Sequence, residues 1–269
     1  MTIRRLRVLA AAAALTALGC FVLLGQNSKP AGHAAAQDDA ALIDDLVLAN
    51  HILARNGVLD AYGHVSVRSQ RNPNHFFLAR HLPAGVITKA DIIEYDFDCK
   101  PVSGDGSQGY TERFIHGEIY RARPDVMAVV HSHPADVIPF SVTGVPLRPL
   151  IHMAGFLPEP MPIFEIRKAG GMTDMLIRDS SLGRALAQTL GDKPAALLRG
   201  HGDVVVAPSL HVVAGRSYYM MVNAKVEQQA ILLSGGKVTY LDPEEARKAA
   251  GQDGFERAWT LWKQELTGK

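Results

Sequence analysis

The chain has 269 residues, 47% of them hydrophobic, and its 28 Lys and Arg nearly balance its 27 Asp and Glu. A chain of this length and apolar content can bury one sizeable core. The near-zero net charge, with no cluster of Lys and Arg along any expected helix, argues against a nucleic-acid partner. We therefore expect one globular domain without a nucleic-acid surface.

The N-terminal region has the pattern of an export signal. Three arginines within residues 1–7 precede an uncharged, Ala- and Leu-rich run over 8–25, and an A-x-A exit ends at Ala36. This pattern predicts a signal peptide over 1–36, a mature domain over 37–269 and a periplasmic location. The alternative is an uncleaved membrane anchor, because the uncharged run is nearly long enough to span a bilayer. After cleavage only Cys99 remains, which excludes an intrachain disulfide.

The first half of the domain is expected to contain two helices and four short strands. Apolar residues recur at helical spacing over 40–56, and a second helix over 111–122 ends before Pro124. The strands cover residues 63–68, 75–79, 92–96 and 126–133. The last of them stops at Pro134, which cannot extend a central strand.

The second half interleaves the same kinds of element. After a helical turn at 135–140 and a proline-containing loop at 145–153, strands are expected at 195–198 and 203–207. The expected helices cover residues 180–190, 210–234 and 243–266. Interleaved strands and helices without a long linker predict one domain of the α/β or α+β class.

The segment His131-Ser132-His133 carries the clearest chemical signal. Residues i and i+2 of a strand face the same side, so both imidazoles project into one space. Such a pair supplies half of a divalent metal site. Taken alone, it is equally typical of a polar pair at a strand edge.

Two further residues extend this pattern. His201 lies between two glycines in the turn that joins two apolar strands, and Glu112 lies near the start of a helix. Alone, His201 is typical of a surface turn, and Glu112 of a carboxylate that favours the helix N-terminus. Together with His131 and His133 they predict a metal site of three histidines and one glutamate.

On these residues the sequence resembles the class II aldolase/adducin family, from about residue 41 to 233. The resemblance rests on AYGHVSVR at 61–68, YRARPDVMAVVHSHP at 120–134 and LLRGHG at 197–202, with Glu112 nineteen residues before His131. It implies that Glu112, His131, His133 and His201 bind Zn²⁺ or another divalent cation such as Mn²⁺, Fe²⁺ or Co²⁺. It also implies a three-layer α/β/α sandwich on a central, mainly antiparallel sheet. A homotetramer with active sites between subunits is expected for the same reason.

Three departures from the sugar-phosphate aldolases of this family bear on the reaction. Residues 63–66 read Gly-His-Val-Ser where those enzymes have Gly-Asn-x-Ser, and residues 78–82 lack their small phosphate-binding residues. Residues 151–153 read Ile-His-Met, without the tyrosine that donates a proton in the fuculose-phosphate type. A phosphate dianion needs several N–H and hydroxyl donors. Phosphate-dependent aldol cleavage is therefore not favoured. The pattern GHVSVR, with SVTGVPLRP and HMAGFL after the His-x-His segment, resembles the decarboxylase branch of the family more closely.

The resemblance and the residue chemistry together nominate site residues beyond the metal ligands. Substrate-binding roles are expected for His64, Ser66, Arg68, Arg80 and His81, and catalytic roles for Glu112 and His152. The alternatives are solvated strand-end charges for the two arginines and a packed loop histidine at position 152. His116, one helical turn after Glu112, is expected either to orient that carboxylate or to lie on the helix surface.

The predicted function is a metal-dependent carbon–carbon lyase that stabilises enolate-type charge on a small-molecule substrate. A decarboxylase of a hydroxylated aromatic or heteroaromatic carboxylate is favoured. Two alternatives stay open: an aldehyde-lyase acting on a sugar or sugar phosphate, and a non-catalytic, adducin-like assembly module.

Overall fold

The computed structural model describes residues 39–102, 106–250 and 254–268. The predicted signal peptide, its cleavage site and the alternative anchor all lie outside these residues. Within the described part of the chain, no helix combines the length and the apolar character that crossing a bilayer requires.

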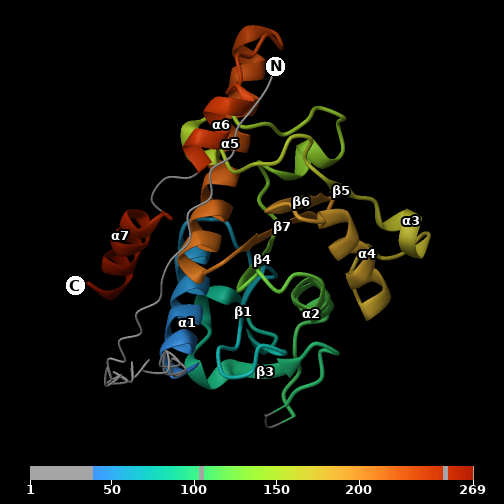
Figure 1. Cartoon of the computed structure of the whole chain (residues 1–269), viewed down its shortest axis with the longest axis vertical. Helices are drawn as coiled ribbons and strands as arrows, with labels where there is room; N and C mark the ends of the chain where they lie inside the picture. The colour runs from blue at the N-terminus through green and yellow to red at the C-terminus, as the bar shows by residue number, and fades with distance from the viewer. Residues whose placement is uncertain (1–38, 103–105, 251–253, 269) are drawn as a thin grey trace, which may run out of the picture. The chain divides into compact units, whose positions relative to one another are not determined.

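A single mixed sheet forms the centre of the domain (Figure 1). Its strands are β1 His64–Arg68, β2 His75–Ala79, β3 Ile92–Asp96, β4 Ala128–Ser132, β5 Ile163–Phe164, β6 Ala195–Leu198 and β7 Gly202–Ala207. They lie in the order β3-β2-β1-β4-β7-β6-β5. Every neighbouring pair is antiparallel except β5 and β6, which confirms the expected mainly antiparallel sheet.

Helices cover both faces of this sheet. They are α1 Asp39–Arg55, α2 Arg113–Ala122, α3 Ile166–Gly170, α4 Ser180–Leu190, α5 Leu210–Ser234, α6 Pro243–Ala250 and α7 Glu256–Thr267. The connections between strands in the described residues contain the short 3-10 turns η1 Ala84–Val86, η2 Lys89–Asp91, η3 Ile138–Ser141 and η4 His152–Ala154.

The core consists of two apolar layers, one on each face of the sheet. Val130 of β4 packs in the layer that includes Leu53 of α1 and Val213 of α5. Its neighbour Val129 packs in the other layer, with residues of α2 and α4 such as Ile115. Successive residues of a strand point to opposite faces, so one fully buried strand serves both layers. The three-layer α/β/α sandwich is therefore confirmed.

The ends of the helices follow local signals in the sequence. The side chain of Ser209 accepts a hydrogen bond from the backbone N–H of Val212 at the start of α5, as helix N-caps commonly do. Gly235 ends α5 with φ 60°, a left-handed conformation that glycine adopts without steric cost. This agreement explains why the expected bounds of α5 match the observed ones.

The single helix expected over 243–266 is wrong, because the structure has two helices there. Gly254 and Phe255 both adopt positive φ before α7 begins. Phe255 packs against α5 at Gly215, where an added Cβ would lie 2.2 Å from the phenyl ring. This tertiary contact overrides the helical pattern of the local sequence. Strand β5 and helix α3 were not expected, because they are too short to produce a periodic signal.

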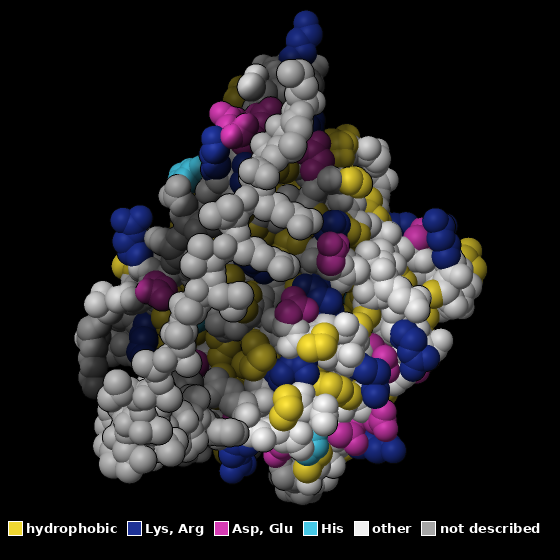
Figure 2. All heavy atoms as spheres, viewed as in Figure 1, with side chains coloured by type: hydrophobic (Ala, Val, Ile, Leu, Met, Phe, Trp, Pro, Cys, Tyr) yellow, Lys and Arg dark blue, Asp and Glu magenta, His cyan; other side chains and the backbone are white. Residues whose placement is uncertain are grey.

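Charged side chains of both signs are interspersed on the face of the described residues that Figure 2 shows. Cys99 is buried, and burial raises the pKa of its thiol to about 12.

Candidate metal centre

The four expected metal ligands come from three separate segments that meet at one edge of the sheet. His131 lies in β4 and His133 just after it, His201 lies in the turn between β6 and β7, and Glu112 directly precedes α2. The β4–β7 ladder pairs Ser132 with Asp203, which brings the turn beside the end of β4. The four ligand residues together constitute the metal centre.

The turn that carries His201 requires glycine at position 202. A Cβ at this position would lie 2.1 Å from the carbonyl oxygen of Ser132 and 2.9 Å from the ring of His133. Only glycine permits this close approach of the turn to β4. The glycine therefore helps to place His201 beside the two histidines of the strand.

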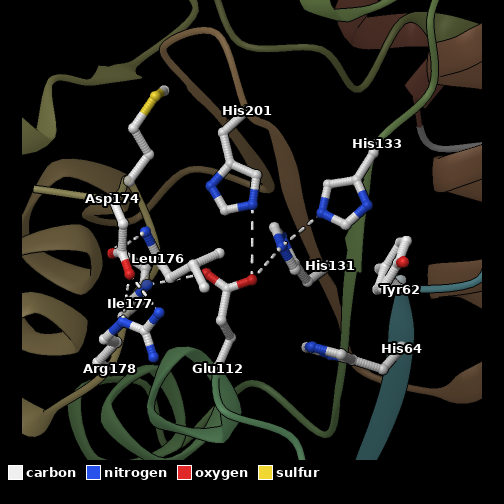
Figure 3. Close-up of polar contacts among 12 residues, drawn as sticks. Tyr62, His64, Glu112, His131, His133, Asp174, Leu176, Ile177, Arg178 and His201 are labelled. Carbon is white, nitrogen blue, oxygen red and sulfur yellow. Dashed lines mark hydrogen bonds and ion pairs between the residues drawn. The ribbon is translucent and has the colours of Figure 1, made fainter. Parts of the chain in front are cut away.

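The ligand atoms of the metal centre all lie within 4.8 Å of one another. Glu112 Oε2 is 3.4 Å from His131 Nε2 and 3.5 Å from His201 Nε2. The Nε2 atoms of His131 and His133 are 3.0 Å apart. Figure 3 shows the three imidazoles and the carboxylate converging on this space.

In three of the four ligand residues, the nitrogen or oxygen atom that does not face the shared space has a hydrogen-bond partner in the protein. His131 Nδ1 is 2.8 Å from the carbonyl oxygen of Asp203, and His133 Nδ1 is 3.1 Å from Asp60 Oδ1. Glu112 Oε1 accepts a hydrogen bond of 2.8 Å from the backbone N–H of Ile177. His201 Nδ1 is buried and has no partner within the described part of the chain. Such outer contacts orient metal-binding side chains in proteins.

These contacts show that the residues fit a divalent cation. A carbonyl or carboxylate oxygen only accepts hydrogen bonds, so Nδ1 carries the hydrogen in both His131 and His133. Their Nε2 atoms then face each other with lone pairs at 3.0 Å, which is repulsive unless a cation lies between them. Three imidazole nitrogens and one carboxylate oxygen are the donors that Zn²⁺ and similar ions take.

The electrostatics of the metal centre favour the ligand forms of its residues. Burial and the neighbouring His131 lower the pKa of His133 to about 4, which keeps that imidazole neutral at neutral pH. Burial alone would raise the pKa of the Glu112 carboxyl. Hydrogen bonds and charge interactions with His131 and His201 outweigh this effect and lower the pKa well below its usual range. Glu112 is therefore ionised.

A pocket of about 580 Å³ opens in front of the metal centre. Aromatic rings form much of its wall: those of Tyr62, His64, His81 and Tyr110. Tyr110 donates its hydroxyl hydrogen to the carbonyl of Leu82, and its ring centroid lies 4.4 Å from that of His64. The structure therefore brings two of the five expected substrate-binding residues, His64 and His81, to the pocket.

The structure does not bring Ser66 to the pocket. The serine lies behind His64, where its Oγ is 2.5 Å from His116 Nδ1 and 2.8 Å from the hydroxyl of Tyr120. His116 is fully buried, so the surface interpretation of this residue is wrong. Its Nε2 is 2.7 Å from His64 Nδ1, and burial lowers the pKa of His116 to about 3. Burial likewise lowers the pKa of His64 well below its usual range.

The two arginines expected to bind substrate lie elsewhere. The guanidinium of Arg68 donates to four backbone carbonyls, those of Pro73, Tyr120, Arg123 and Val126. Four of its five N–H groups are thus bonded to the backbone and the residue is 5% exposed, so it is not a solvated charge. Arg80 pairs with Asp91 at 2.6 Å and does not line the pocket. Neither guanidinium lines the pocket of its own chain, because both are bonded to other partners.

His152 lies apart from the metal centre within one chain. It lies in η4 and lines a second pocket together with Arg216 and Phe255. The structure therefore does not join His152 to the other expected site residues of the same chain.

Asp60, which orients His133, has no role in the sequence-based prediction. Its Oδ1 also accepts the backbone N–H groups of Tyr62 and Gly63, each at 2.9 Å. An Asp that precedes a glycine by three residues is a common turn signal, and this signal was available in the sequence.

Comparisons with known proteins agree with this arrangement. Residues 44–227 match the model of the Class II Aldolase and Adducin N-terminal domain. The decarboxylase tropJ of Talaromyces stipitatus is 38% identical over 240 residues, which cover 80% of this chain and 90% of that protein. A 3,4-dihydroxyphthalate decarboxylase of Arthrobacter keyseri is 30% identical over 254 residues, covering 90% and 97%.

Solved structures share the fold. An aldolase II superfamily protein from Pseudomonas syringae has a TM-score of 0.71 at 22% identity, covering 87% of this chain and 94% of that one. An L-fuculose 1-phosphate aldolase from Glaciozyma antarctica has a TM-score of 0.69 at 23% identity, covering 89% and 95%. The match to the family model spans the sheet, the metal centre and most of α5. The chain therefore belongs to the class II aldolase and adducin family.

Proposed function

We propose that this protein is a metal-dependent decarboxylase that removes carbon dioxide from a hydroxylated aromatic or heteroaromatic carboxylate. One observation carries the proposal: three histidines and a glutamate converge at the floor of a pocket that has aromatic walls. Flat ring surfaces suit a planar substrate. The relatives named as decarboxylases, one of them acting on a dihydroxyphthalate, support the same conclusion.

The pocket offers little to a phosphate group. A phosphate dianion is usually held by several N–H and hydroxyl donors. Arg or Lys often supplies the N–H groups. None of the described residues that line the pocket is Lys or Arg. This observation favours the decarboxylase over an aldolase acting on sugar phosphates. The complete ligand set argues against a purely structural, adducin-like role.

The chain's own residues have distinct roles in this reaction. His131, His133, His201 and Glu112 hold the cation, while Asp60 and the carbonyl of Asp203 fix two of the rings. When bound, a divalent cation there supplies a Lewis acid for the substrate's hydroxyl and carboxylate oxygens and for the charge that develops as the carbon–carbon bond breaks. His64 and His81 line the wall, where they contact the remaining polar groups of the substrate.

We propose export to the periplasm by the signal peptide over 1–36, and a homotetramer with active sites between subunits. In such a tetramer an acid–base role for His152 depends on a neighbouring copy, because His152 lies away from the metal centre of its own chain. Light scattering of the purified protein measures the assembly.

A substrate screen on the chain starting near Gln37 tests the proposed reaction. We expect release of carbon dioxide from a dihydroxyphthalate-type acid in the presence of Zn²⁺ or Mn²⁺, and no aldehyde release from a sugar phosphate. Cleavage of the sugar phosphate alone would establish the aldolase instead. A purified protein that takes up no divalent ion and acts on neither substrate would point to an assembly module.

A further inference from the structure

Four buried side chains form a continuous hydrogen-bond chain behind the pocket. Tyr120 Oη is 2.8 Å from Ser66 Oγ, which is 2.5 Å from His116 Nδ1. His116 Nε2 is in turn 2.7 Å from His64 Nδ1. All four residues are 0–1% exposed. This hydrogen-bond chain links helix α2 to strand β1. His64, at its end, lines the pocket.

The direction of these hydrogen bonds follows from the Tyr120 end. Among the described residues, Ser66 is the only side chain that hydrogen-bonds to the phenol. A buried phenol hydrogen needs an acceptor, so Tyr120 donates to Ser66. Ser66 then donates its own hydrogen to His116 Nδ1. With Nδ1 accepting, the neutral ring of His116 carries its hydrogen on Nε2 and donates to His64 Nδ1.

The opposite direction leaves one group unsatisfied. If His64 donated to His116 and His116 to Ser66, then Ser66 would donate to the phenol oxygen. The phenol hydrogen would have no acceptor within the described part of the chain. An unpaired buried donor carries the full cost of its desolvation. The direction from Tyr120 to His64 instead gives each hydrogen between the four side chains an acceptor and leaves the one unpaired hydrogen on His64, which lines the pocket.

The other nitrogen of His64 faces the substrate space. His64 pairs with His131 across the β1–β4 ladder, and their ring centroids are 5.3 Å apart. Nε2 of His64 has no hydrogen-bond partner among the described residues, although the residue lines the pocket. Figure 3 shows the ring extending from β1 toward Glu112.

We propose that the hydrogen-bond chain locks His64 as the neutral tautomer with its hydrogen on Nε2, so that His64 donates a hydrogen bond to a substrate oxygen beside the metal centre. The substrate class rests on the proposed function, and the tautomer does not. His64 is a binding residue in this scheme, while Tyr120, Ser66 and His116 are positioning residues.

The same hydrogen-bond chain is unsuited to supply protons to a substrate. Its far end, Tyr120, is only 1% exposed, and burial raises the pKa of the phenol above its usual range, so Tyr120 does not readily give up a hydrogen to replace one lost from His64. A proton given up by His64 would therefore leave a buried charge along the chain. His64 accordingly holds its hydrogen and acts by hydrogen bonding alone.

Nitrogen-15 NMR of the zinc-loaded protein, labelled at histidine, reads the tautomers directly. We expect protonated Nε2 and unprotonated Nδ1 signals for both His64 and His116, assigned by their loss in His64→Gln and His116→Gln. Hydrogen on Nδ1 of either ring would overturn the proposal. This measurement needs no substrate, so it stands whether or not carbon dioxide release is found.

Ser66→Ala removes the link that orients His116. We expect the two tautomers of His116 and His64 to become mixed, and carbon dioxide release to fall roughly tenfold. Ser217→Ala is the matched control, because Ser217 is equally buried but its hydroxyl has no partner among the described residues. Unchanged tautomers and unchanged activity in Ser66→Ala would contradict the proposal that the hydrogen-bond chain fixes the tautomer of His64.

Two substitutions of His64 itself test the donor. His64→Leu removes the N–H group, and kcat/KM is expected to fall roughly ten- to hundredfold. His64→Gln retains an N–H donor on a side chain of similar reach, so it should recover most of this loss. Equal losses in both variants, with both proteins folded by thermal unfolding, would contradict the donor role.

Discussion

The two ends of strand β1 carry two buried polar clusters that differ in how completely they are bonded. At one end, the guanidinium of Arg68 gives its hydrogens to four backbone carbonyls. At the other end, beside His64, the Nε2 atoms of His131 and His133 are 3.0 Å apart, and the acceptors at both Nδ1 atoms place the ring hydrogens away from this contact. The first cluster is nearly complete without a ligand, whereas the second has the donor set and geometry that fit a cation. Completeness of hydrogen bonding thus separates a structural cluster from a functional one.

The largest expected effect comes from the incomplete cluster. His131→Ala should remove bound divalent ion and lower carbon dioxide release by more than the roughly 10–100-fold typical of changes around a metal site. The folded structure should survive, because the domain's two apolar layers are untouched. Metal analysis and steady-state kinetics measure both properties. His211→Gln, at the start of α5, is the control and should behave as wild type.

Acid pH should destabilise the protein through the buried histidines. Burial lowers the pKa of His116 to about 3, against about 6.5 in an unfolded chain, so the unfolded chain binds this proton more readily. The contribution is fully present above pH ~6.5 and is lost as the pH falls toward 3, at about 1.4 kcal/mol per pH unit. Urea unfolding across this range should show a shallower pH dependence for His116→Gln. An identical dependence in both proteins would refute this assignment.

Arg68→Met should have the opposite profile to His131→Ala. Loss of the guanidinium leaves buried carbonyls without donors, and we expect the free energy of unfolding to fall by about 2–4 kcal/mol. Metal content and activity per folded molecule should not change, because Arg68 does not line the pocket. Chemical denaturation and kinetics below the unfolding transition test this contrast. A loss of activity at full stability would restore Arg68 as a substrate contact.

Asp60 orients one of the expected metal ligands. Its carboxylate accepts from His133 Nδ1 at 3.1 Å. Asp60→Ala should weaken metal binding roughly 10–100-fold, because the ring of His133 loses its orientation. Asp60→Asn retains an oxygen acceptor and should show a smaller loss. Competition with a chelating dye measures the affinities, and equal affinity in all three proteins would exclude the orienting role.

Two buried tyrosines should differ slightly in how much their hydroxyl groups stabilise the fold. Tyr120 donates within the hydrogen-bond chain, whereas the hydroxyl of Tyr95 has no partner among the described residues. Tyr120→Phe should therefore cost about 1 kcal/mol of unfolding free energy, and Tyr95→Phe close to nothing. Thermal unfolding of the pair measures the difference. A larger loss in Tyr95→Phe would contradict the assigned hydrogen bonds.

Local patterns predicted most of the fold. The limits of β2, β3, β6, α4 and α5 match expectation because caps, glycines and strand periodicity lie in the sequence itself. The break between α6 and α7 depends on Phe255 packing at Gly215, a contact between distant residues. No local pattern reports such a contact.

The metal centre was predictable and its surroundings were less so. The two histidines of the His-x-His segment, His201 and Glu112 could be named from strand geometry and family resemblance, and the structure places them together. The partners of Arg68, Ser66 and His116 depend on how α2 packs on β1, which the sequence does not specify. Charged residues near a motif were therefore assigned to the substrate although their hydrogen bonds go to the protein itself.

Glu112, His131, His133 and His201 are proposed to share one divalent cation. Equilibrium dialysis of metal-stripped protein against Zn²⁺ tests it most directly, with the double substitution His131→Ala and His133→Ala in parallel. We predict one tightly bound ion per chain, and none in the double variant. No tight binding to the wild-type protein, or equal binding to both, would contradict the account.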